Sequence, residues 1–425
     1  MRPNNLNQTA PYAIFFLVLP YGISSGFVSV TLPFLLVKHG FSVEATASIT
    51  ALGLSANLWR FLWAPFTDLT LSLHQWYRIG NALCALTLLS LCGIPLKLSS
   101  SFWLTLIVFI SQIAATLVVS PVGGFMATTI SEKRKGLAGG WYQAGNVGGL
   151  GFGGGAGIWL STHYNYQIAI MVLCLIMLAC MLSLQIVAPV RPDRSQNMAG
   201  RFRLMLADLK TLTRSAVSLY SIIVIVTPVG IGAAAYIWSS VGGDWHAGAD
   251  LVALVNGLLG AAITVIGCIF GGWVADRFGR WWSFFGGGSV MALISTLMAL
   301  SAFTPITYTA GILTYAFAFG WASAAFSAVA LLAIGADLGS TKYALVSSIS
   351  NIAPVYMTAL DGWVYGHSGI KAMLLAESVL GGVFVVVSLF VLAWLNRRKQ
   401  LKDLMAAKVV AVSNEVKNRG FTHSN

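Results

Sequence analysis

The chain has 425 residues, of which 57% are apolar and only 9% are charged, and its mean hydropathy is +0.79. Because soluble domains carry about 25% charged residues, this composition excludes an ordinary soluble protein and indicates a polytopic membrane protein. The net charge of +12 does not indicate nucleic-acid binding, since the basic residues gather in the loops between apolar runs. The five cysteines lie inside those runs without C-x-x-C spacing, so neither a metal site nor a disulfide framework is predicted, and no cofactor is expected.

A membrane-spanning helix needs about 20 consecutive apolar residues, and the sequence offers twelve such runs. In chain order they cover 11–37, 45–66, 79–96, 102–126, 137–161, 167–189, 217–240, 251–275, 282–303, 307–335, 343–365 and 372–396. The first run lacks a small-residue cleavage site, so we expect it to remain as a span rather than to be removed as a signal peptide.

The basic residues predict how these spans are oriented. If the N-terminus is cytoplasmic, the opposite side carries only Lys38, Lys97 and Lys371, Arg60 lies inside a span, and every other Lys and Arg faces the cytoplasm. An excess of cytoplasmic Lys and Arg is what sets membrane topology. We therefore expect a multi-pass protein of the inner (cytoplasmic) membrane with both termini in the cytoplasm.

Polar stretches divide the chain into four parts. We expect an N-terminal six-helix bundle at 1–190, a cytoplasmic linker at 191–216, a C-terminal six-helix bundle at 217–396 and a cytoplasmic tail at 397–425. Apolar residues at helical spacing within the linker predict an amphipathic helix on the membrane surface. The basic tail is expected to be a frayed helix followed by disorder.

Landmark residues recur between the two halves. The matched pairs are Asp68 with Asp276, 208 residues apart, and Glu132 with Asp337 and Asn146 with Asn351, each 205 residues apart. Repeats of this kind are common in secondary transporters. The predicted fold class is therefore all-α: a polytopic membrane protein with twelve transmembrane helices in two pseudo-symmetric six-helix bundles.

The run at 137–161 contains ten glycines between Gly139 and Gly157. Each glycine in a helix costs about 1 kcal/mol relative to alanine, so the set needs a compensating role. Close approach of neighbouring helices is the expected role. A nucleotide-binding glycine motif is not indicated, because no strand precedes the run.

A short charged stretch, Gly272-Trp-Val-Ala-Asp276-Arg277-Phe-Gly279-Arg280, joins the runs at 251–275 and 282–303. We expect Arg277 and Arg280 to serve the carbonyl end of one helix and Asp276 the amide end of the next. Gly272 is expected to allow close helix approach and Gly279 to form the turn. A generic basic hairpin is the alternative. The stretch resembles the G-x-x-x-D-R-x-G-R loop signature of the major facilitator superfamily, which implies that these residues and Asp68 form a conformational latch.

The corresponding stretch in the first half reads Trp-Arg-Phe-Leu-Trp-Ala-Pro-Phe-Thr-Asp at 59–68. It resembles the peptide–acetyl-coenzyme A–drug transporter group of that superfamily, which includes muropeptide and siderophore permeases. The muropeptide permeases carry an acidic residue after a glutamine in the fourth span, whereas Gln112 is followed by Ile113 here. The resemblance implies a secondary active transporter for a siderophore-, muropeptide- or drug-like solute.

Ionisable residues inside the bilayer are costly, so each one is a functional hypothesis. Asp361, in the run at 343–365, is the preferred proton-coupling carboxylate. Arg60 either contacts an anionic solute, pairs with Asp68 or extends to the headgroups. Glu377, in the last run, is expected to touch lipid headgroups or a neighbouring helix at the periphery.

Polar and aromatic residues near the middle of the runs are the candidates for lining a substrate cavity, with structural interhelical hydrogen bonds as the alternative. The candidates are Tyr21, Gln112, Gln143, Asn146, Asn256, Tyr315, Trp321, Asn351 and Tyr356. A surface rich in amides and aromatic rings suits a larger, partly apolar solute that forms hydrogen bonds.

Three classes of function remain. A secondary transporter, not an enzyme, is preferred, with a small-molecule substrate, membrane lipids and protons as partners, no nucleic acid, and a monomeric state. A membrane-embedded enzyme is the first alternative, but the six histidines are scattered and no catalytic motif is present. A non-transporting receptor with a transporter fold is the second.

Overall fold

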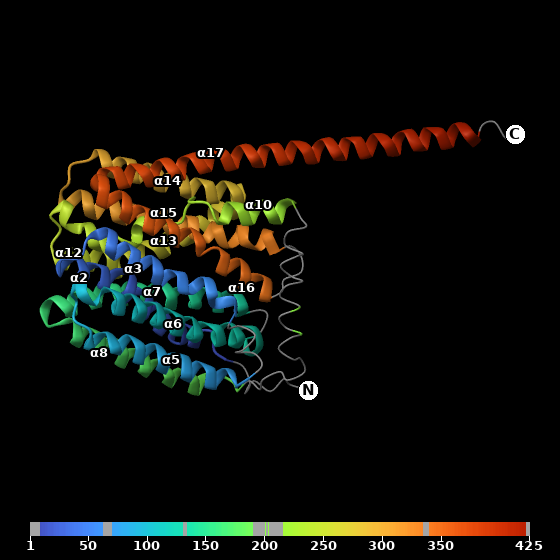
Figure 1. The fold of residues 1–425 in the computed structure, drawn as a ribbon. Helices are drawn as coiled ribbons and strands as arrows, with labels where there is room; N and C mark the ends of the chain where they lie inside the picture. The colour runs from blue at the N-terminus through green and yellow to red at the C-terminus, as the bar shows by residue number, and fades with distance from the viewer. Residues whose placement is uncertain are drawn as a thin grey trace.

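The computed structural model describes residues 9–62, 70–130, 134–189, 200, 203, 216–334 and 340–421. Over these residues the regular elements are all helical, and the long helices of both bundles lie side by side (Figure 1). The chain begins at one end of these helices, which we call the terminal face. The opposite end, where α2 and α12 lie, is called the distal face (Figure 1).

The N-terminal half follows the predicted spans closely. Its elements are α1 (Ala13–Gly26), η2 (Phe27–Thr31), α2 (Leu32–Lys38), α3 (Val43–Ser55), η3 (Ala56–Trp59), α5 (Leu73–Ser90), η4 (Leu91–Gly93), η5 (Leu98–Ser100), α6 (Ser101–Thr129), α7 (Lys135–His163), α8 (Tyr166–Ala179) and η7 (Cys180–Ile186). Helix α5 begins six residues before its predicted start. A capping box between Ser72 and Gln75 satisfies its first amides and fixes that start.

The C-terminal half is more broken. Its elements are α10 (Ala216–Ile225), η8 (Ala233–Tyr236), α11 (Trp238–Val241), η9 (Gly242–Trp245), α12 (Ala249–Leu254), η10 (Val255–Leu259), α13 (Gly260–Phe278), α14 (Arg280–Leu300), α15 (Pro305–Ile334), α16 (Ser340–Ile349) and α17 (Ile352–Phe421). Gly369, with φ +75°, divides α17 into two limbs. Seven helices in the described part of the chain are long and apolar enough to cross a membrane.

Three predicted spans are interrupted, so the expectation of continuous helices there is wrong. The run at 251–275 has a kink at Gly257, whose φ and ψ are −99° and −121°. The other two runs break more widely. The run at 217–240 leaves helical geometry after Ile225, where Pro228 has no amide proton and Gly230 and Gly232 have φ of +68° and +69°. The run at 343–365 breaks between α16 and α17, where Pro354 cannot donate to the carbonyl of Ser350. Both breaks release backbone groups from helical hydrogen bonds.

The predictions for the cytoplasmic tail and for the cytoplasmic linker fare differently. The tail stays helical as far as Phe421 and projects beyond the bundle, so the expected disorder after a frayed start is wrong for this stretch (Figure 1). The amphipathic helix expected at 191–216 lies almost wholly outside the described residues.

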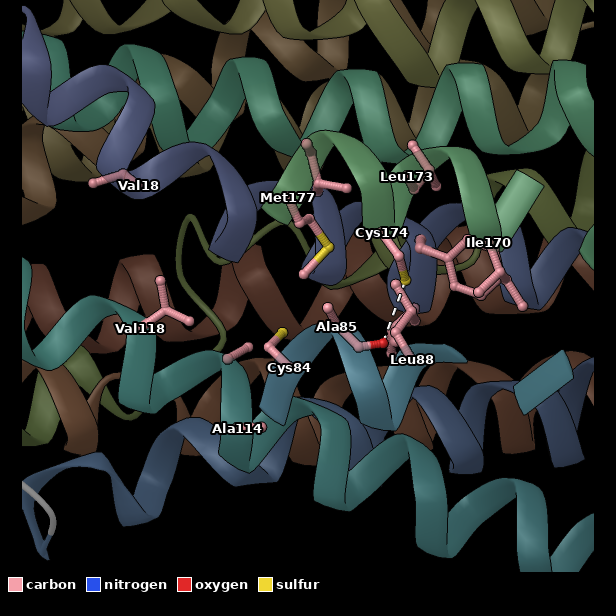
Figure 2. Packing of buried hydrophobic residues seen from close by; sticks show 14 of the residues in the cluster. Val18, Cys84, Ala85, Leu88, Ala114, Val118, Ile170, Leu173, Cys174 and Met177 are labelled. Carbon is pink, nitrogen blue, oxygen red and sulfur yellow. Dashed lines mark hydrogen bonds between the residues drawn. The ribbon is translucent and has the colours of Figure 1, made fainter. Parts of the chain in front are cut away.

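Figure 2 shows the packing of α5 against α6 and α8 in the N-terminal half. Cys84, Leu88 and Met177 are fully buried there, and the thiol of Cys174 contacts the Ala85 carbonyl oxygen at 3.3 Å. These two cysteines are therefore small core residues.

Glycines bring α1 and α7 together. A Cβ added at Gly22 would lie 2.5 Å from the carbonyl oxygen of Asn146, and one added at Gly149 would lie 2.8 Å from that of Leu19. Both distances are too short for any other residue unless the helices separate. The predicted role of the α7 glycines in close helix approach is confirmed.

The two halves also meet closely toward the distal face. A Cβ added at Gly155 of α7 would lie 2.9 Å from both the Ala253 carbonyl oxygen and the Gly257 Cα in the other half. One buried apolar cluster likewise combines Ile158 of the N-terminal half with Trp238 of the C-terminal half. The distal side is therefore closed in this conformation.

Candidate functional site

Two carboxyl groups lie near each other inside the C-terminal half. Asp361 and Glu377 stand on opposite limbs of α17, each eight residues from the turn at Gly369. Two helices that rise 1.5 Å per residue from one turn bring such residues to the same depth, about 12 Å from the turn. Asp361 is fully buried and interacts electrostatically with Glu377.

Of the two contacts expected for Glu377, lipid headgroups or a neighbouring helix, the structure shows the second, because its partners lie on neighbouring elements. Its carboxylate accepts hydrogen bonds from the hydroxyl of Tyr315, from the hydroxyl of Ser295 at 3.4 Å and from the backbone amide of Ala234 at 3.4 Å. These donors belong to α15, α14 and η8. The carboxylate therefore joins the last span to three elements of its own half.

Asp361 has the opposite environment. Neither of its carboxyl oxygens has a hydrogen-bond partner among the described residues. A charged carboxylate in such a position would be strongly unfavourable, because burial removes its water without supplying donors. The sequence singled out this residue, and the structure places it beside Glu377 and Tyr315.

A separate chain of hydrogen bonds lies next to this group. The Asn256 amide donates to the Tyr308 hydroxyl at 2.9 Å, and that hydroxyl donates to the Trp238 carbonyl oxygen at 2.9 Å. The carbonyl is available because α11 is only four residues long. The Trp238 ring packs edge-on against Tyr315 with centroids 5.5 Å apart, which connects the chain to the carboxyl pair.

A second polar group lies in the N-terminal half. The Tyr21 hydroxyl donates to the Asn57 side-chain oxygen at 3.1 Å, and Arg60 and Tyr142 are its electrostatic neighbours. Tyr236, from the broken stretch of the other half, also interacts with Tyr21. We call these five residues the tyrosine patch. It contains residues from both halves and combines phenols, an amide and a guanidinium group.

Other candidates from the sequence form structural bonds. Gln112 is only 3% exposed and binds the hydroxyls of Ser24 and Ser25 at 3.2 and 3.4 Å, so it joins α6 to α1 instead of lining an open surface. On α7, Gln143 is exposed and Asn146 is half-buried.

Three further candidates lie at helix breaks or contacts. The Trp321 indole donates to the Ser283 hydroxyl at 3.0 Å and so joins α15 to α14. Asn351 binds the Ser347 carbonyl at 2.7 Å, at the break before α17. The Tyr356 hydroxyl binds the Val226 carbonyl at 2.9 Å and so connects the two broken spans.

The charged stretch at 272–280 differs in part from expectation. Gly279 has φ +101° and forms the predicted turn. Gly272 has open space around it, whereas a Cβ at Gly271 would lie 2.7 Å from the Trp321 Cα, so the close-approach role belongs to Gly271.

The charges in this stretch are also placed differently. Asp276 lies in the last turn of α13 and Arg280 begins α14, which is the reverse of what the helix dipoles favour. Arg277 lies over the rings of Trp273 and Phe278 at 5.9 and 6.0 Å. No ion pair involves Asp276 within the described ranges, and Asp68 lies outside them.

Sequence reasoning missed Glu377 and Asn57 as members of these groups. For Glu377, the usable signal was that it and Asp361 are equally spaced from Gly369. For Asn57, the signal was an amide side chain in an apolar run, three residues before Arg60.

The profile described as Major Facilitator Superfamily matches residues 14–341. No curated protein matches the sequence. Among solved structures, a POT family transporter in complex with 5-aminolevulinic acid is 10% identical, covers 90% of this chain and 95% of its own, and has a TM-score of 0.69.

Two other solved structures are similar to the same degree. A D-xylose–proton symporter is 14% identical, with 89% of this chain and 96% of its own covered and a TM-score of 0.67. A nucleoside transporter is 11% identical, with 89% and 98% covered and a TM-score of 0.67. At this identity the likeness establishes the fold, and the predicted fold class of twelve transmembrane helices in two bundles is confirmed.

Proposed function

The chain belongs to the major facilitator superfamily of membrane transporters, and on that premise we propose that it moves a siderophore-, muropeptide- or drug-like organic solute by proton-coupled alternating access. It is a transporter rather than an enzyme. The observation that carries the proposal is the pair of polar groups described above: the tyrosine patch with residues of both halves, and a fully buried carboxyl within one half.

The tyrosine patch supports a hydrogen-bonding solute. Tyr21, Asn57 and Tyr142 offer phenol and amide groups, and Arg60 offers a positive charge to an acidic group of the solute. Such a surface favours a partly apolar solute with several acceptors over a small, highly charged ion. Asn256, Asn146 and Gln143 extend the proposed contact surface to other spans.

Asp361 is the proposed proton carrier. Its burial without partners favours the neutral, protonated form in this conformation. Release toward the terminal face would follow when that side opens and water reaches the group. A charge that crosses the membrane gains about 2.3 kcal/mol per 100 mV, which is enough to drive appreciable accumulation of a solute.

The stretch at 272–280 is the proposed latch. Asp276 lies at the negative end of the α13 dipole and Arg280 at the positive end of the α14 dipole, so both positions are electrostatically unfavourable. An oppositely charged partner in a second conformation would stabilise each of them. Asp68 and the flanking residues Gly272, Arg277 and Gly279 complete the proposed set. The charged side chains of this set would then hold the two halves together on the terminal side when the distal side opens.

We further propose that the terminal face is cytoplasmic and that the protein works as a monomer in the inner membrane. The supporting observation is the charge distribution, in which Lys38, Lys97 and Lys371 are the only basic residues expected on the opposite side.

The test is uptake of candidate solutes by liposomes that contain the purified protein, with and without an imposed pH gradient. We expect gradient-dependent accumulation by the wild type and its loss in Asp361→Asn. If accumulation ignores the gradient, proton coupling is wrong. If the gradient matters but the Asn variant matches the wild type, Asp361 is the wrong carrier. Chemical conversion of the solute, or binding without uptake, would favour an enzyme or a receptor.

A further inference from the structure

The fully buried Asp361 carboxyl and the half-buried Glu377 carboxyl differ sharply in what surrounds them. Glu377 accepts hydrogen bonds from the Tyr315 hydroxyl, the Ser295 hydroxyl and the Ala234 amide. Asp361 accepts none from the described residues and is fully buried. Hydrogen bonds from several donors stabilise the charged form of a carboxylate, whereas burial without donors favours the neutral form.

The closeness of the two groups adds a second constraint. Like charges at short range in a medium of low dielectric constant oppose one another, so two adjacent carboxyls lose their protons in separate steps. The first proton leaves the group whose anion has donors, which is Glu377. The second stays on the group whose anion has none.

We propose that Asp361 and Glu377 form one site that holds a single exchangeable proton, carried by Asp361 while Glu377 remains the charged acceptor of Tyr315. This proposal rests on the proposed function and deepens it. It replaces an isolated carrier by a two-carboxyl site, in which Glu377 sets how tightly Asp361 holds its proton.

Two unpartnered donors support a second state of this site. Thr358 is fully buried on the same face of α17, one turn before Asp361, and its hydroxyl has no partner in the described chain. The Trp238 indole N–H is likewise buried without a partner, and its ring packs on Tyr315. These groups could donate to Asp361 after it loses its proton.

The site is connected to the closed distal face. Glu377 binds the Ala234 amide in the broken stretch, and Ala234 and Trp238 belong to the apolar cluster that also contains Ile158 of the other half. A second negative charge on Asp361 would repel Glu377 and loosen the contact between the two limbs of α17. Proton loss would thereby weaken the packing that closes the distal side.

Other charged groups near these elements are engaged elsewhere or farther along the helices. Glu44 of α3 faces Gly366, Asp244 accepts a hydrogen bond from Tyr365 at 2.8 Å, and the Lys371 ammonium lies over the Phe303 ring at 5.6 Å. Tyr315 is the titratable group of α15 that faces the pair. Over the described residues, Glu377 is the carboxyl that interacts with Asp361.

Infrared difference spectroscopy of the purified protein across a pH titration tests the site without any solute. The carbonyl stretch of a protonated carboxyl, identified by its shift in deuterium oxide, is the signal. We expect one such band to remain at a pH where Asp244 and the exposed carboxyls have lost their protons, and this band disappears in Asp361→Asn even though Glu377 is intact. In Glu377→Gln the band should remain and its titration midpoint should fall, because a neighbouring negative charge is gone. Asp244→Asn is the matched control and should leave the band and its midpoint unchanged.

A band that persists in Asp361→Asn, or a titration midpoint of the Asp361 band that is the same in Glu377→Gln and the wild type, would overturn the proposal.

Tyr315→Phe provides a second route if either variant folds poorly. Loss of the Tyr315 donor should shift the midpoint, and an unshifted band would remove Tyr315 from the site. Exchange of potassium for sodium should leave the band unchanged, while a sodium-dependent loss would identify a sodium site instead. Uptake by liposomes is a separate measurement, so the two proposals can fail independently. Gradient-driven uptake without the expected band would refute the two-carboxyl site alone, and the expected band without uptake would refute the transport function alone.

Discussion

Substitution of Gly155 by alanine should shift the protein toward a conformation that is open on the distal side. The added Cβ would lie 2.9 Å from the Ala253 carbonyl oxygen and from the Gly257 Cα, both of which are backbone atoms of the other half. Backbone atoms cannot rotate away as a side chain can. The clash exists only while the two halves touch, so it penalises the distal-closed state alone.

The size of the effect follows from ordinary overpacking. One methyl group forced into a filled contact costs about 1–3 kcal/mol. A free-energy difference of this size changes a conformational equilibrium roughly 5–150-fold. The same substitution removes a helical glycine and thereby stabilises α7 by up to about 1 kcal/mol in both conformations. The variant should therefore open more readily without losing overall stability.

Thiol labelling measures the opening. Ile158 is fully buried in the cluster that joins the two halves, so a cysteine placed there in a background without the native cysteines reports exposure of the contact. Gly148→Ala is the matched control, since its Cβ would meet nothing nearer than the Phe15 ring at 3.9 Å. We expect faster labelling in Gly155→Ala than in the control. Equal rates in both variants would refute the inferred role of this contact in distal closure.

Three further predictions follow from individual contacts. Asp276→Asn should impair transport without loss of membrane insertion, because the proposed latch loses its acidic member; normal uptake by a well-inserted variant would contradict the latch. Gly26→Ala should lower the melting temperature, at a cost of about 1–3 kcal/mol, because its Cβ would overlap the Leu150 carbonyl, whereas Gly123→Ala, with open space around it, should not. Burial raises the pKa of the Asp244 carboxyl above its usual range, and a carboxyl of this kind loses stabilising effect as pH rises through that raised value. Melting temperatures should therefore fall less in Asp244→Asn than in the wild type as pH rises just above the ordinary range of aspartate.

The spans were predictable because a bilayer demands long apolar runs and leaves little freedom in their length. The breaks were visible as Pro228, Gly230, Gly232 and Pro354, but the surrounding apolar residues still read as continuous spans. Backbone geometry, rather than hydropathy, decides where such a run stops being helical. The glycines of α7 were predictable because their number had no other physical explanation.

The carboxyl pair was only half predictable. Asp361 was recognisable as a costly residue in an apolar run. The hydrogen bonds of Glu377 depend on which helices surround the last span, and one sequence does not reveal those neighbours. Likewise, the exchange of roles between Gly272 and Gly271 reflects a rotation of one residue, about 100° around the helix, which spacing alone does not resolve.

Uptake by proteoliposomes of a solute that stabilises the purified protein against heat tests the central claim most directly. A panel of siderophores, muropeptide fragments and drugs supplies the candidates, and a dye inside the vesicles reports the pH. The account predicts that such a solute accumulates unchanged when protons are driven inward, that the interior acidifies with it, and that Asp361→Asn abolishes both. A solute that stabilises the protein yet stays outside the vesicles under every gradient would contradict the account and indicate a receptor with a transporter fold.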